Sequence, residues 1–166
     1  MLLTIFMAVI LCAAASLLMF SAVAFIQEQS MFSSAPEEVK KLIQPREKEL
    51  FPGARIIGWT LFLFALIMIL GVFIIPGWDG HRNGFTFQQY FFRYLFIFTA
   101  YKLYDMIFFD YFLLLRFGFF QYYYPEAANV MTGRKYGFNI RSQLIKLLLV
   151  FPAIAALISW ICTLIK

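Results

Sequence analysis

Three long stretches of the chain contain no charged side chain, and they constrain its fold more than any other feature. They run from Leu2 to Ile26, from Ile56 to Ile75 and from Leu147 to Ile165, and contain 25, 20 and 19 residues. A helix rises about 1.5 Å per residue, so each stretch is long enough to cross a hydrocarbon layer of roughly 30 Å. Only 14% of the residues are charged, against about 25% in soluble domains. The sequence therefore predicts an all-α integral membrane protein and disfavours an ordinary soluble enzyme.

A fourth stretch, residues 91–115, is largely apolar although it contains charged side chains, and eleven of its residues are Phe or Tyr. We therefore expect one domain, residues 1–166, folded as a bundle of four transmembrane helices. The predicted spans are 2–26, 56–75, 91–115 and 147–165, with loops at 27–55 and 116–146. Ala22 and Ala24 are typical of a signal-peptide cleavage site, but no positive charge precedes this apolar stretch, so we interpret it as a span.

The distribution of Lys and Arg predicts the orientation, because cytoplasmic loops of membrane proteins are enriched in these residues. Loops 27–55 and 116–146 lie on one side of the membrane, whereas the other side carries only Arg82 and Lys166. We expect both loops in the cytoplasm and both termini outside, in the plasma membrane of a bacterium. The basic loop residues behind this prediction are Lys40, Lys41, Arg46, Lys48, Arg55, Arg116, Arg134, Lys135 and Arg141.

Both loops contain signals for short helices. Residues 34–37 have the form of a capping box with Pro36 in the first turn, and Pro125 opens a segment that Gly133 would end. We expect these helices to lie on the membrane surface. The alternatives are a docking site for a cytoplasmic partner in the first loop and a pocket for an anionic lipid head group in the second. The head-group contacts would come from Arg116, Arg134, Lys135 and Arg141.

Small residues recur at four-residue spacing in the first and last spans, and such stripes let helices approach closely in lipid. We expect these faces to contact protein, in the same chain, in a second copy or in another membrane protein. Cys12 and Cys162 lie inside spans, so we expect no disulfide framework and no zinc site. The sequence predicts no metal, no cofactor and no nucleic-acid partner. The small-residue faces are Ala8, Cys12 and Ser16, and Ala155, Ser159 and Thr163.

The candidate functional residues are Lys102, Asp105 and Asp110 in the third span. An ionised group at this depth costs roughly 2.5–3.5 kcal/mol, so such groups face protein or water and pair with one another. Lys102 and Asp105 are three residues apart and can meet on one helix face. Asp110 lies on another face and needs a partner from a second helix, a Tyr hydroxyl or water. Arg93, nearer the outer boundary, is expected to extend outward to water.

The pattern Lys-x-x-Asp-x-x-x-x-Asp-aromatic, formed by Lys102, Asp105, Asp110 and Tyr111, resembles one found in an uncharacterised group of small bacterial polytopic membrane proteins. In that group the pattern lies in the penultimate span. The resemblance implies a helical membrane fold and no particular activity. The loop arrangement is also similar to that of the four-helix glutathione-utilising membrane enzymes. Their charged cluster in the second span is missing from residues 56–75, so we reject that assignment.

Three classes of function remain open. We favour a non-enzymatic membrane component or assembly subunit, in which the charged cluster stabilises the helices; a partner beside each charge would support it. The alternative is proton- or cation-coupled transport through an oligomer, which a water-filled cavity at Asp110 and Lys102 would support. A membrane-embedded lipid-modifying enzyme is the third class, which a lipid-shaped groove beside Asp105 and Arg134 would support.

Overall fold

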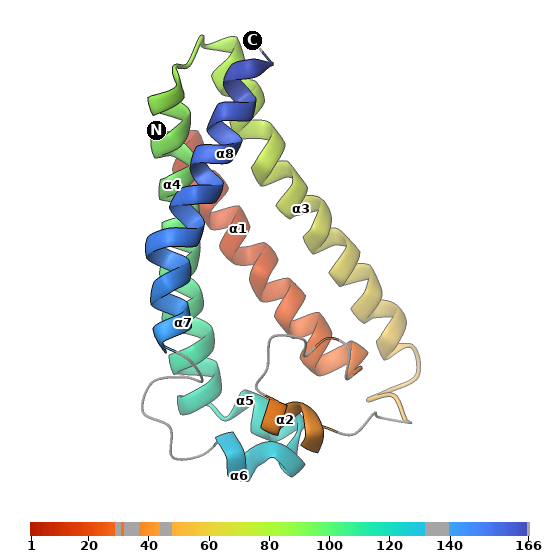
Figure 1. Ribbon diagram of the computed structural model, residues 1–166. Helices are drawn as coiled ribbons and strands as arrows, with labels where there is room; N and C mark the ends of the chain where they lie inside the picture. Colours follow the sequence, from red (N-terminus) through yellow and green to blue (C-terminus); the bar gives the residue numbers. More distant parts are fainter. Residues whose placement is uncertain (29–30, 32–36, 44–47, 132–139, 166) are drawn as a thin grey trace.

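The computed structural model describes the chain except residues 29–30, 32–36, 44–47, 132–139 and 166. The described residues form helices joined by turns and short irregular segments, and they contain no strand. Long helices run between two ends of the molecule, and both termini lie at the same end (Figure 1). We refer to this as the terminal end and to the opposite one as the loop end. The prediction of an all-α fold is confirmed.

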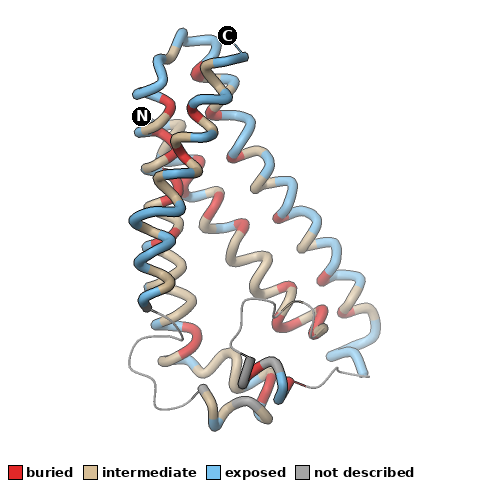
Figure 2. Tube along the Cα trace, viewed as in Figure 1, coloured by how far each residue is buried: buried red, intermediate tan, exposed pale blue. Residues whose placement is uncertain are grey.

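Three of the helices are long and apolar enough to cross a membrane. The first is α1 (Leu2–Phe20) with its π-helical continuation η1 (Ser21–Ile26), and the second is α3 (Ala54–Arg82). The third consists of α7 (Ile140–Ile145), the π-helical η5 (Lys146–Val150) and α8 (Phe151–Leu164). Most of α3 is exposed along its length (Figure 2), as expected for a helix that faces lipid.

The fourth long helix consists of α4 (Phe87–Tyr104, 18 residues) and the π-helical η3 (Asp105–Arg116, 12 residues). Thr86 and Gln89 form a capping box at its start, where the Thr86 backbone N–H donates to Gln89 Oε1 at 2.8 Å. It packs against α1 on one side and α8 on the other, and it contacts α3 over only a short length. The charged helix is therefore the central element of the fold.

Two helix boundaries differ from those predicted. The predicted end of the second span at residue 75 is wrong, because α3 continues through Pro76 to Arg82. Proline usually ends a helix because it lacks an N–H donor, but here side chains of α4 bond to carbonyls around Pro76, as described below. The last helix begins at Ile140 rather than Leu147, and its π-helical turn η5 directly precedes Pro152. The missing N–H of Pro152 explains an altered hydrogen-bond pattern in that turn.

Short helices from the two loops pack together at the loop end. They are α2 (Glu37–Leu42), α5 (Phe119–Tyr123), η4 (Pro125–Ala127) and α6 (Ala128–Met131) (Figure 1). Val39 and Ile43 are buried in one cluster with Leu114 and Tyr124. The apolar face predicted to lie on the membrane surface therefore contacts the other loop. Residues 34–36 of the expected capping box and the expected stop at Gly133 lie outside the described residues.

At the terminal end, all four long helices contribute to one apolar cluster. Ala8 of α1 and Ala155 of α8 are buried against aromatic residues of α4, among them Tyr94 and Phe98. Further along, the hydroxyls of Ser16 and Tyr104 are 2.8 Å apart and link α1 to α4. Ala8, Ser16 and Ala155 of the two small-residue stripes thus contact other helices of the same chain, as one of the expected alternatives stated. Contact with a second chain through them stays a prediction.

Glycine is required where α3 passes the end of η1. A Cβ added at Gly58 would lie 2.8 Å from Phe25 Cβ and 2.8 Å from Ile26 Cγ1, closer than carbon atoms pack. At Gly71 in the same helix, an added Cβ would meet only Ile75 Cδ1, at an ordinary 3.6 Å. The contact between α3 and η1 therefore depends on Gly58.

We expect Gly58→Ala to lower the free energy of unfolding by about 1–3 kcal/mol, the usual cost of overpacking. Gly71→Ala, the matched control, should leave stability unchanged or raise it slightly, because alanine favours helix over glycine. Denaturant titration in mixed micelles measures the free energy of unfolding of both variants. Equal effects of the two substitutions would show that the approach of α3 to η1 does not limit stability.

Candidate functional site

The polar side chains of α4 and η3 form two groups at different depths. We call the first the terminal-end contact: Tyr90, Arg93 and Tyr94 of α4 with residues of α3. We call the second the mid-helix cluster: Lys102, Asp105 and Asp110 with Gln143 of α7. The sequence predicted the core of the second group, but not the first.

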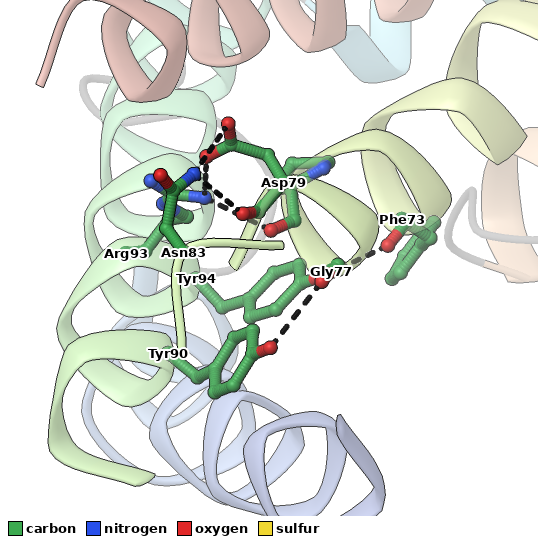
Figure 3. Close-up of polar contacts among 8 residues, drawn as sticks. Phe73, Gly77, Asp79, Asn83, Tyr90, Arg93 and Tyr94 are labelled. Carbon is green, nitrogen blue, oxygen red and sulfur yellow. Dashed lines mark hydrogen bonds and ion pairs between the residues drawn. The ribbon is translucent and has the colours of Figure 1, made fainter. Parts of the chain in front are cut away.

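In the terminal-end contact, three side chains of α4 donate hydrogen bonds to α3 (Figure 3). The Tyr94 hydroxyl donates to the carbonyl of Phe73 at 2.7 Å, and the Tyr90 hydroxyl donates to that of Gly77 at 3.3 Å. Arg93 Nη1 donates to the carbonyl of Pro76 at 2.9 Å and to Asp79 Oδ2 at 2.7 Å. Three carbonyls around Pro76 thus receive donors from the neighbouring helix.

Gly77 and Gly80 lack a Cβ atom, and this allows the side chains of α4 to come close to the backbone of α3. A Cβ at Gly80 would lie 2.3 Å from Tyr90 Cε1, which no packing permits. A Cβ at Gly77 would lie 3.1 Å from the Tyr94 hydroxyl and 3.3 Å from Cys162 Sγ of α8. Glycines at these two positions therefore bring α3, α4 and α8 together at the terminal end.

Arg93 contradicts the expectation that it extends outward to water. Its side chain is 7% exposed, it forms an ion pair with Asp79, and its guanidinium carbon lies 4.3 Å from the centre of the Phe85 ring. The physical reason is the length of α3: because the helix continues past Pro76, it carries Asp79 to the level of Arg93. Asp79 was missed in the sequence because it lies beyond residue 75, the predicted end of the second span.

In the mid-helix cluster, Lys102 Nζ forms a hydrogen-bonded ion pair with Asp105 Oδ2, as the three-residue spacing predicted. The Lys102 side chain is 5% exposed and that of Asp105 is 19% exposed. The pair lies where α4 changes into the π-helical η3, since Asp105 is the first residue of η3. The two opposite charges compensate each other inside the helix layer.

Asp110 obtains its partner from another helix, one of the possibilities that the sequence left open. Gln143 Nε2 of α7 donates to Asp110 Oδ2 at 3.1 Å. Lys146 of η5 is close enough to act on the charge of Asp110, as are Asp105 and Lys102. Gln143 and Lys146 were missed because Gln143 is uncharged and Lys146 precedes the predicted span by one residue.

The four residues proposed to bind a lipid head group do not form one site among the described residues. Arg116 ends η3 and lies against Tyr111, with its Nε donating to the hydroxyl at 3.3 Å. Arg141 is exposed on α7. Arg134 and Lys135 lie outside the described residues. The head-group pocket therefore stays a prediction.

In both groups, the charged side chains have polar partners in contact. Arg93 faces Asp79, and Lys102 faces Asp105, so each cation has a carboxylate in contact. Asp110 has an amide in contact and Lys146 within electrostatic range. Paired charges of this kind are the form in which ionised groups are tolerated in lipid.

Comparison with models of protein families, with curated proteins and with solved structures finds no match to this chain. The geometry of the two polar groups is therefore the basis for a functional assignment.

We expect Arg93→Leu to destabilise the fold by about 3–5 kcal/mol, because it leaves Asp79 and the Pro76 carbonyl without a buried donor. Arg82→Leu is the control, since Arg82 is exposed and lies 5.0 Å from the centre of the Trp78 ring. That substitution should cost well under about 1 kcal/mol. The free energies of unfolding of the two variants, measured in micelles, test this prediction. Similar losses of stability in both variants would contradict a specific role for the buried pair.

Proposed function

We propose that the chain is a non-enzymatic component or assembly subunit of a bacterial plasma membrane, crossing it four times with both termini outside. In this role the charged helix formed by α4 and η3 stabilises the packing of the other helices. The observation that carries the proposal is the pairing of charges on α4 and η3. In the described part of the chain, each charged side chain of that helix has a partner: Arg93 with Asp79, Lys102 with Asp105, Asp110 with Gln143, and Arg116 with Tyr111.

The position of α4 supports a fourth span. It lies between α1 and α8, two of the helices that are long and apolar enough to cross a membrane. Together with η3 it is as long as its neighbours. A helix packed between two spanning helices occupies the same layer, and the ion pairs lower the cost of its charges.

Transport and lipid chemistry receive less support. A hollow of about 500 Å³ lies on the surface of α4, and its lining residues are apolar apart from one threonine. None of the charged residues of the mid-helix cluster lines it, so it offers neither a water-filled route to Asp110 nor a lipid groove beside Asp105. The lining residues are Phe92, Leu95, Phe96, Thr99, Ala100 and Leu103.

A double-mutant cycle on Lys102 and Asp105 tests the structural role. Lys102→Met and Asp105→Leu each leave one charge unpaired and should lower the free energy of unfolding by about 3–5 kcal/mol. The double variant removes both charges and should lose less than either single variant. Lys48→Met, at an exposed loop residue, is the control for the loss of a lysine.

The proposal would be overturned by the opposite pattern. Additive losses in the double variant would show that the pair does not act as a unit. A proton or cation flux in liposomes holding the wild-type chain, abolished by Asp110→Asn in variants of normal stability, would replace the structural role with transport.

The proposed orientation predicts different labelling at the two ends of the chain. In a background with Cys12→Ala and Cys162→Ala, an impermeant thiol reagent applied to intact cells should label His81→Cys and leave Ser33→Cys unlabelled. His81 is exposed in the last turn of α3, and Ser33 belongs to the predicted loop 27–55. After permeabilisation both variants should react. Labelling of Ser33→Cys in intact cells would invert the orientation.

A further inference from the structure

One buried acceptor in the mid-helix cluster is not explained by the structural role. Gln143 uses its Nε2 to donate to Asp110 Oδ2, while its Oε1 is enclosed and has no hydrogen-bond partner among the described residues. Leaving a buried acceptor unsatisfied costs about 1–3 kcal/mol. We therefore expect a state of the molecule in which a donor forms a hydrogen bond to Gln143 Oε1.

The chemistry of the two groups indicates what that state is. An ionised carboxylate has only acceptor oxygens, as does the amide carbonyl, so Asp110 cannot bond to Gln143 Oε1 while it is charged. A protonated carboxyl group gains one O–H donor and keeps an acceptor oxygen. It can then form two parallel bonds with a primary amide: the amide N–H donates to one carboxyl oxygen, and the carboxyl O–H donates to the amide oxygen. One of these two bonds is already in place.

The charged groups around Asp110 do not prevent it from binding a proton. Lys102, the buried cation nearest in the chain, is engaged by Asp105, and Asp105 itself acts on Asp110 as a like charge. From α4 the Tyr101 hydroxyl also lies within electrostatic range of Asp110. From η5, Lys146 acts on it as a cation, but Lys146 is exposed and no hydrogen bond joins the two among the contacts described. Asp110 therefore has no cation in contact to hold it ionised.

The backbone is π-helical at Asp110, and a second π-helical segment begins three residues after Gln143. Asp110 lies within η3, and Gln143 lies in the last turn before η5. Single π-helical turns often mark functional sites, because the wider turn displaces backbone carbonyls from the regular pattern. Here two such segments flank one polar contact, and few backbone contacts join η3 to α7 beyond it.

We infer that Asp110 and Gln143 form a proton-binding site between η3 and α7. On uptake, a proton from water forms an O–H bond at the free oxygen of Asp110, and this O–H donates to Gln143 Oε1. The hydronium ion that delivers the proton loses one O–H bond and becomes water, and release of the proton reverses this step. The site goes beyond the proposed structural function, which requires only that Asp110 has a partner and not that it binds a proton.

Infrared spectroscopy of the purified chain in nanodiscs tests the site. At mildly acidic pH, the wild-type spectrum should contain a protonated-carboxyl C=O band that is lost in Asp110→Asn. In Gln143→Leu the band should persist at a higher frequency, because the O–H has lost its acceptor. Glu49→Gln, which removes an exposed carboxyl group outside both polar groups, should leave the band unchanged.

Two results would overturn the inference. A wild-type spectrum without a carboxyl band that depends on Asp110 would show that this group stays ionised. A band that depends on Asp110 and does not move in Gln143→Leu would show that the amide takes no part. Both results are independent of the unfolding measurements on Lys102 and Asp105, so the structural function could fail or hold separately. A circular dichroism spectrum like that of wild type is required of each variant, and Gln143→Asn provides a second, more conservative change at the amide.

Discussion

The fold depends on the requirement that a charge placed among apolar side chains must have a partner there. α4 is the central helix and is also the most polar of the long helices. The charged side chains of α4 and η3 have three kinds of partner: Arg93 has an aspartate on α3, Lys102 has an aspartate in the same long helix, and Asp110 accepts a hydrogen bond from an amide on α7. Two of these partners come from other helices, so compensating the charges also fixes which helices lie beside α4.

The helix packing is uneven along the molecule. At the terminal end, small residues such as glycine and alanine allow aromatic side chains of α4 to reach the backbone of α3. Toward the loop end α3 runs away from α4 (Figure 1), and the helices are joined there by the cluster of Val39, Ile43 and Tyr124. The structure is thus a group of helices that converge at one end.

The sequence was sufficient to predict the long apolar helices because length and absence of charge are local properties. It was also sufficient for the Lys102–Asp105 pair, since that contact depends only on helical spacing. It could not predict the Arg93–Asp79 pair, because this pair requires α3 to continue through Pro76, and that continuation is stabilised by donors from α4.

The face presented by Asp110 was equally hard to predict. The predicted position of Asp110 around the helix axis assumes regular α-helical geometry. Residues 105–116 are π-helical, and a π-helix turns less per residue. Gln143 carries no charge and gave no signal of its own. What the sequence did indicate correctly was the need for a partner on a second helix.

The cluster at the loop end has a consequence for biosynthesis. Its buried residues are Val23, Val39, Ile43, Leu114 and Tyr124, all of which precede the fourth long helix in the chain. This cluster can therefore join the first long helix to the charged helix while the ribosome is still translating α7 and α8. The last helix then docks onto the side of α4 that α1 leaves uncovered, so the order of synthesis matches the order in which the surfaces of α4 are filled.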